Sequence, residues 1–114
     1  MNIHQPIIVT VSFPNKEIAL EIAKQLIEKR LIACAQFSAI DSLYRWQNQL
    51  EKSQEVMMHA KSIHTYWPAI QTSIKQLHPY EVPEIIATSI LEIDASYLHW
   101  MLEELGQSGQ QLYV

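Results

Sequence analysis

Two long, consecutive strand patterns limit the fold more than any other feature of this 114-residue sequence. Residues 32–46 show no helical period and are rich in β-branched and aromatic side chains, which favours a strand, bulged near residues 38–39 or 41–42. Residues 55–61 alternate between two faces, which predicts a second strand. The connection at 47–49 contains an asparagine, which tolerates positive φ, so the two strands are expected to form an antiparallel hairpin.

The patterns around this hairpin complete a recognisable order of elements. The expected elements are a buried strand at 7–11, an amphipathic helix at 15–30, a helix from Thr65 to His78, a strand at 84–91 and a last helix from Asp94 to Gly106. Together with the hairpin they give the ferredoxin-like βαββαβ arrangement with a short C-terminal helix, an α+β fold with helices on one sheet face. No linker or repeat interrupts the order, so residues 1–114 are predicted to form a single domain.

Both faces of the predicted hairpin carry apolar side chains. Leu43 and Tyr44 are adjacent, as are Met57 and Met58, so each pair places one side chain on either face. An antiparallel sheet can leave one face in water, but a second apolar face indicates that another subunit covers it. Charged residues make up only 18% of the chain, which also favours a partly covered surface. The hairpin therefore predicts self-association.

Composition excludes several classes of function. The formal net charge of −4 argues against nonspecific nucleic-acid binding, which needs a basic surface. The two glycines, Gly106 and Gly109, cannot form a phosphate-binding loop, and the single cysteine, Cys34, cannot form an intramolecular disulfide. No signal peptide or membrane span is evident, so we expect a cytoplasmic protein with no membrane partner. No nucleophile–base pair or metal triad is evident either, so we expect no enzyme.

The segment His78-Pro79-Tyr80-Glu81-Val82-Pro83-Glu84 is the most unusual stretch of the chain. Two prolines stiffen it, and it presents an imidazole, a phenol and carboxylates between a helix and a strand. Loops held on rigid scaffolds often bind ligands. The alternative is a rigid crossover in which the histidine caps the helix end and the tyrosine packs. The residues alone leave both interpretations open.

Five segments, in this order and spacing, resemble the CutA family of divalent-cation tolerance proteins. They are Ile32-Ala33-Cys34-Ala35, Ser42-Leu43-Tyr44-Arg45-Trp46-Gln47 with Leu50-Glu51, Glu55-Val56 leading to Lys61, the segment from His78 to Glu84, and Tyr97-Leu98-His99-Trp100. The resemblance implies a ferredoxin-like protomer in a tight homotrimer, similar in architecture to PII signalling proteins. It also implies a role in tolerance of copper and other divalent ions, with no required cofactor and no established catalytic reaction.

The resemblance also bears on metal binding. In some bacterial members copper ligation is ascribed to a cysteine and a His-His pair, and the matching positions here are Val11, Leu77 and His78. Only His78 retains a donor, so we expect weak, non-selective binding of Cu²⁺ or another divalent cation. Glu81 or Glu84 would supply oxygen ligands beside it. We expect the imidazole to face solvent.

The family motifs further predict an intersubunit cleft. It would gather Glu55, Lys61, Tyr80 and Glu84, with Cys34 and Trp46 nearby. Glu55 and Lys61 share a face of their strand but lie about 20 Å apart along it. Two functions stay open: a metal-binding trimer that responds to divalent ions, or a PII-like sensor whose intersubunit clefts bind a small ligand such as an anion or nucleotide.

Overall fold

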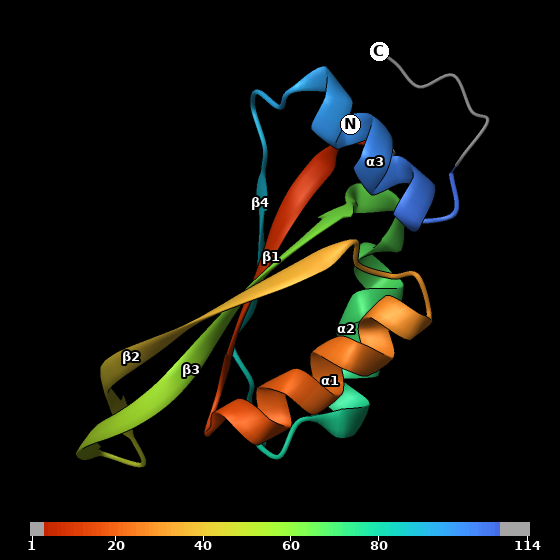
Figure 1. Cartoon of the computed structure of the whole chain (residues 1–114). Helices are drawn as coiled ribbons and strands as arrows, with labels where there is room; N and C mark the ends of the chain where they lie inside the picture. The colour runs from red at the N-terminus through yellow and green to blue at the C-terminus, as the bar shows by residue number, and fades with distance from the viewer. Residues whose placement is uncertain (1–3, 108–114) are drawn as a thin grey trace.

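The computed structural model describes residues 4–107. The remaining residues of the predicted 1–114 domain, 1–3 and 108–114, lie outside the described range. The elements are β1 (Pro6–Phe13), α1 (Lys16–Glu28), β2 (Cys34–Trp46), β3 (Gln49–Ile63), the 3-10 turn η1 (His64–Tyr66), α2 (Trp67–Leu77), β4 (Ile85–Ser89) and α3 (Ala95–Glu104). Their order confirms the predicted ferredoxin-like α+β fold (Figure 1). Within residues 4–107 no helix is long and apolar enough to cross a membrane.

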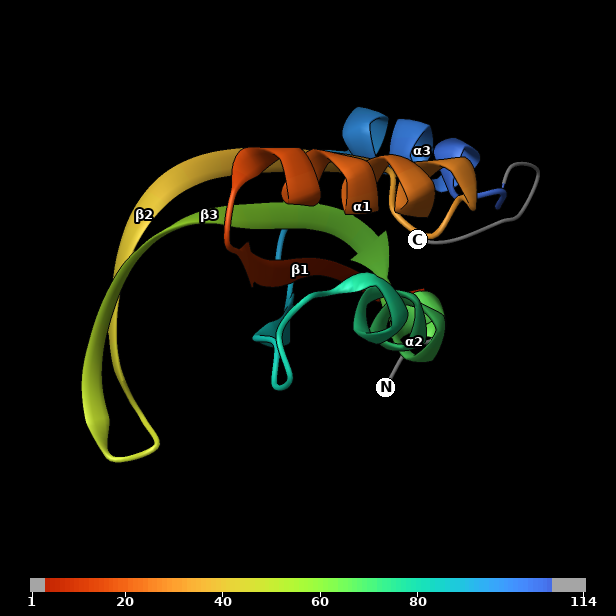
Figure 2. The ribbon, with the colours of Figure 1, turned by 90° about the horizontal axis from the view of Figure 1, so that it is seen from below.

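The four strands form one sheet in the order β2-β3-β1-β4, and every pair is antiparallel. The long hairpin of β2 and β3 keeps one register from the Cys34–Lys61 pair to the Trp46–Gln49 pair. The predicted bulge at 38–39 or 41–42 is wrong, because every residue of β2 has one partner on β3. The curvature of the hairpin is therefore distributed along both strands (Figure 2).

The turn of the hairpin is tighter than expected. Gln47 and Asn48 alone form it, with φ values of 50° and 64°, while Gln49 already belongs to β3. Positive φ at both central positions gives a turn whose twist matches that of the flanking strands. The predicted tolerance of Asn48 for positive φ is confirmed, and Gln47 adopts the same backbone region.

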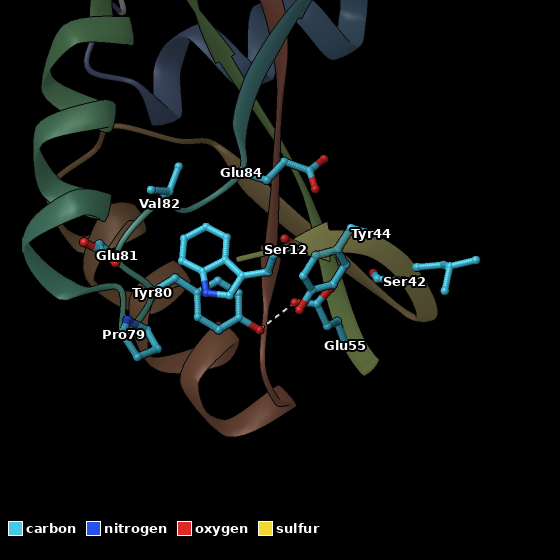
Figure 3. Close-up of a pocket in the computed structure, with 11 residues that line it drawn as sticks. Ser12, Ser42, Tyr44, Glu55, Pro79, Tyr80, Glu81, Val82 and Glu84 are labelled. Carbon is cyan, nitrogen blue, oxygen red and sulfur yellow. Dashed lines mark hydrogen bonds between the residues drawn. The ribbon is translucent and has the colours of Figure 1, made fainter. Parts of the chain in front are cut away.

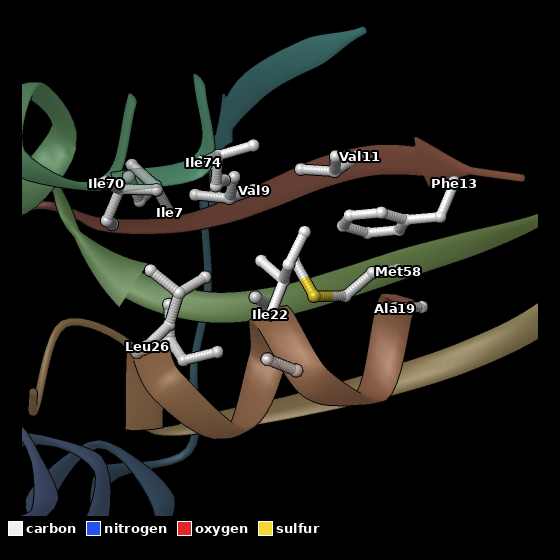
Figure 4. Packing of buried hydrophobic residues seen from close by; sticks show 13 residues of the cluster. Ile7, Val9, Val11, Phe13, Ala19, Ile22, Leu26, Met58, Ile70 and Ile74 are labelled. Atoms are coloured by element: carbon white, nitrogen blue, oxygen red, sulfur yellow. The ribbon is translucent and has the colours of Figure 1, made fainter. Parts of the chain in front are cut away.

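One face of the sheet packs against α1 and α2 (Figure 4). Because side chains alternate along a strand, β1 directs every second residue into this core. Its buried side chains are Ile7, Val9, Val11, Phe13, Ala19, Ile22, Ala23, Leu26, Ile32, Met58, Ala60, Ile70 and Ile74. Apolar side chains of both helices contribute to it, although Ile27 of α1 and Leu77 of α2 remain 44% and 37% exposed.

Capping chemistry sets the N-termini of α1 and α3 and the C-terminus of α3. The Asn15 side chain accepts a hydrogen bond from the Ile18 amide, and the Asp94 carboxylate accepts two, from Ser96 and Tyr97. Gly106 ends α3 at a φ of +78°. The predicted start of α2 at Thr65 is wrong, because η1 precedes α2 and places Thr65 inside that turn.

The third helix covers one end of the sheet. Met101 and Leu102 of α3, with Leu105 directly after it, pack against Ala33 and Ile63, where β2 begins and β3 ends. The opposite end of the hairpin extends past the helices and curls toward the α2–β4 loop (Figure 2). The curl brings residues 42–46 of β2 to the same cavity as the loop residues from Pro79 to Glu84.

Candidate functional site

A cavity of about 650 Å³ lies between the curled hairpin and the α2–β4 loop. Side chains from β1, β2, β3 and the loop line it, namely Ser12, Ser42, Leu43, Tyr44, Trp46, Glu55, Pro79, Tyr80, Glu81, Val82 and Glu84 (Figure 3). Four of the six residues predicted for the cleft, Trp46, Glu55, Tyr80 and Glu84, are therefore brought together by the fold of one chain.

Glu55 and Tyr80 form a hydrogen bond inside this cavity. The Tyr80 hydroxyl donates to Glu55 Oε2 at 2.5 Å, and Figure 3 shows the two side chains directed at each other. Glu55 is only 7% exposed. Burial, reinforced by the hydrogen bond and the charge of Glu55, raises the pKa of Tyr80 well above its ordinary value of 10. Tyr80 therefore remains a neutral donor to a buried carboxylate.

His78 fixes the loop from which Tyr80 projects. Its ring stacks on Phe13 at a centroid distance of 4.9 Å. Nε2 lies 2.8 Å from the Ser12 carbonyl oxygen, and Nδ1 accepts a hydrogen bond from the Tyr80 amide at 3.1 Å. This arrangement requires a neutral ring with its proton on Nε2. Burial lowers the pKa of His78 below 6.5, although the bond to Ser12 and the charge of Glu55 oppose the shift.

The prediction that His78 faces solvent is wrong, and its contacts argue against the predicted role as a metal ligand. The residue is 8% exposed, and both ring nitrogens are engaged by backbone groups. A metal ligand needs an imidazole nitrogen with a free lone pair, and neither nitrogen offers one. Glu81 and Glu84 line the cavity, but no group of three His, Cys, Asp or Glu side chains that could hold a metal ion occurs within residues 4–107. His78 is the residue that ends α2, but its side chain bonds to Ser12 and to the Tyr80 amide and does not cap the helix; ligand binding by the loop stays a prediction.

Cys34 and Lys61 lie at the other end of the hairpin. Cys34 is the first residue of β2 and pairs with Lys61 of β3. Lys61 lies six positions beyond Glu55 on the same strand. Lys61 Nζ donates to Gln36 Oε1 at 2.6 Å, and Cys34 Sγ lies 3.3 Å from the Tyr97 hydroxyl. The hydrogen bond with Cys34 raises the pKa of Tyr97 to about 12. Within one chain these two residues do not line the cavity, and their meeting with it across a subunit boundary stays a prediction.

Several lining residues were missed by the sequence analysis. Tyr44 could have been identified from the sequence, because it belongs to the Ser42–Trp46 motif. Alternation along β2 places its side chain on the same face of the sheet as Trp46. Ser12 carried no such signal, because it lies within a β1 run that otherwise predicts a buried strand.

The charges of the cavity are all negative. Glu55, Glu81 and Glu84 contribute carboxylates, and no lysine, arginine or histidine is among the lining residues. Such a lining repels phosphates and other anions. The cavity of a single chain therefore offers no support for the anion- or nucleotide-binding alternative.

Comparison with known proteins agrees with this architecture. A profile of the family described as CutA1 divalent ion tolerance protein matches residues 7–104. The chain belongs to the CutA1 family. The divalent-cation tolerance protein CutA of Thermus thermophilus is 39% identical over 100 residues, a region that covers 87% of this chain and 97% of that protein.

Solved CutA1 structures share the fold. CutA1 from Pyrococcus horikoshii has a TM-score of 0.83 at 37% identity, covering 86% of this chain and 96% of that one. CutA1 from the psychrotrophic bacterium Shewanella sp. SIB1 has a TM-score of 0.84 at 39% identity, covering 88% and 94%. The family assignment made from the five sequence segments is therefore confirmed.

Removal of the Tyr80 hydroxyl should destabilise this CutA1-family chain. The Tyr80→Phe variant leaves Glu55 buried without its donor, so we expect the free energy of unfolding to fall by about 1.5–3 kcal/mol. Urea denaturation at fixed protein concentration measures the change. Tyr44→Phe is the matched control, because Tyr44 lines the same cavity and is 43% exposed. Equal losses in the two variants would contradict the assigned role of the Tyr80–Glu55 bond.

The buried His78 should make stability depend on pH. The pKa of His78 is lowered in the native state. As the pH falls below about 6.5, the unfolded chain therefore binds a proton that the native chain does not, and the free energy of unfolding decreases. Above that pH the contribution is fully present. Melting temperatures from about pH 8 to about pH 5 should show a smaller decrease in His78→Gln than in the wild type. His59→Gln, at an exposed position, should keep the wild-type slope, and identical slopes in all three proteins would refute the assignment.

Proposed function

We propose that this chain acts in tolerance of divalent cations, copper among them, as a homotrimer and not as an enzyme. The observation that carries the proposal is the match of residues 7–104 to the CutA1 divalent ion tolerance family. Relatives from Thermus thermophilus and Pyrococcus horikoshii bear the name divalent-cation tolerance protein. The cytoplasmic location stays a prediction.

The hairpin and the sheet edges support self-association. At the hairpin tip Leu43 is 68% and Leu50 is 70% exposed, and Trp46 beside them is 42% exposed. Both β2 and β4 are edge strands of the four-stranded sheet. Edge strands present unpaired backbone groups that favour pairing with another chain. If the β2 edge of one copy pairs with the β4 edge of the next, the contact is head-to-tail. Repeating such a contact from copy to copy can close into a ring.

Direct metal binding, as we propose it, is weak. His78 offers no free nitrogen, whereas His99 and Glu103 on α3 form an exposed pair of possible ligands. They lie one helical turn apart, 3.8 Å between Nε2 and Oε1, and are 78% and 50% exposed. Two ligands on an exposed helix leave most of a coordination shell to water, so affinity and selectivity are low.

The oligomer can be tested by light scattering. We expect a particle of about 40 kDa, three times the 13.2-kDa chain. The Leu50→Glu variant should shift it toward the monomer, because a charge at the hairpin tip opposes burial there. Leu20→Glu, on the outer side of α1 and 47% exposed, is the matched control and should stay trimeric. A wild-type mass near 13.2 kDa at micromolar concentration would refute the trimer.

The cation function can be tested in cells that lack their own family member. Expression of this chain should raise the Cu²⁺ concentration that stops growth, compared with an empty vector. Calorimetric titration of the purified protein with Cu²⁺ should give weak binding that weakens further in His99→Gln and is unchanged in His78→Gln.

Two outcomes would contradict this account. Unchanged tolerance on expression would remove the cation function. Tight Cu²⁺ binding that disappears in a folded His78→Gln variant would show that metal binding displaces the hydrogen bonds of His78.

A further inference from the structure

Met57 and His59 place two metal donors next to each other on β3. Met58 between them is buried in the core under the helices (Figure 4). Because side chains alternate along a strand, Met57 and His59 both lie on the opposite, open face of the sheet. A thioether and an imidazole that are neighbours on one face can hold a single small ion between them.

The surroundings of His59 leave one ring nitrogen for an ion. Thr10, its cross-strand partner on β1, places Oγ1 3.4 Å from His59 Nδ1. A ligating histidine commonly donates its second ring N–H to such an oxygen, which fixes the tautomer and the orientation of the ring. Nε2 has no hydrogen-bond or ion-pair partner among residues 4–107. His59 differs in this respect from His78, whose two ring nitrogens are both engaged.

The donor types favour copper in its reduced state. Thioether sulfur is a soft ligand that selects Cu⁺, and imidazole also suits copper. Cu⁺ accepts low coordination numbers, whereas a structural zinc ion usually requires a full tetrahedron of ligands. The cross-strand partners of the pair are Ser12 and Thr10 on β1 and Ser38 and Gln36 on β2, and none of them carries a charge. The pair therefore lacks the carboxylates that hard cations prefer.

The open face of the sheet turns inward in the ring of copies proposed above. Helices α1 and α2 cover the other face, and the sheet is concave toward the open face, since Ser12, Tyr44 and Glu55 of that face line one cavity. Three four-stranded sheets joined at their β2 and β4 edges would give twelve strands with the helices outside. A barrel of about eight strands is filled by its own side chains, and larger barrels enclose space. The pair thus faces an interior that an ion can enter.

We propose that Met57 and His59 of each copy bind one Cu⁺ ion on the inner face of the ring. Met57 Sδ and His59 Nε2 are the two protein ligands, and Thr10 orients the imidazole. The proposal rests on the proposed homotrimer and its copper role. It adds a site for reduced copper that uses neither His99 nor Glu103, the weak Cu²⁺ ligands on α3.

The test is an anaerobic titration of the full chain with Cu⁺ held by bicinchoninate, whose coloured complex loses absorbance when the protein removes the ion. Wild-type protein should take up one Cu⁺ per chain. Met57→Leu keeps an apolar side chain of similar size without the sulfur, and His59→Gln removes the imidazole, so each should weaken binding about tenfold or more. Met58→Leu is the matched control, because its sulfur is buried in the core, and its affinity should equal that of the wild type.

The single thiol of the chain, Cys34, requires a control of its own. Cys34→Ser should bind Cu⁺ as the wild type does. Loss of binding in Cys34→Ser together with unchanged binding in Met57→Leu would place the ion at the thiol and overturn the proposal. Equal losses in Met57→Leu and Met58→Leu would also overturn it.

Light scattering of the same samples separates this proposal from the homotrimer on which it rests. A wild-type trimer that takes up no Cu⁺ would refute the copper site alone. A monomeric wild-type protein would refute the homotrimer and with it the enclosed site.

Discussion

The alternation of side chains along β1 is the constraint on which the remaining structure depends. β1 lies between β3 and β4 and pairs with both, so its position fixes two registers at once. Val9, Val11 and Phe13 are fully buried against the helices, and a shift by one residue would move all of them to the opposite face. The same alternation directs Ser12 to that opposite face, where it lines the cavity.

His78 connects this central strand to the cavity. The imidazole stacks on Phe13, its Nε2 bonds to the Ser12 carbonyl, and its Nδ1 receives the Tyr80 amide. These contacts set the backbone of the loop, and the loop directs the Tyr80 hydroxyl to Glu55. A neutral imidazole suits this position because it can donate at one nitrogen and accept at the other. The residue predicted as a metal ligand is thus a structural link between the core and the cavity.

Local chemistry predicted most elements, and its failures have local causes. The helices predicted to start at Asn15 and Asp94 do so, because each short polar side chain accepts from the first free amides. The helix predicted from Thr65 starts later, since the chain leaves β3 through a 3-10 turn that the sequence pattern did not reveal. The expected bulge near residues 38–39 or 41–42 was also wrong, because twist spread along two long strands can bend a hairpin without an extra residue.

The sequence by itself determined the order of the elements, the buried face of each helix, the hairpin and the family, because periodicity, capping and motif spacing are local properties of the chain. Only the tertiary structure decided which of the motif residues meet. Tyr80 and Glu55 lie 25 positions apart yet touch, whereas Lys61, only six positions from Glu55 on the same strand, lies at the far end of the hairpin. The physical reason is that such contacts depend on sheet register, on the curl of the hairpin and on the hydrogen bonds of His78, which join segments distant in sequence.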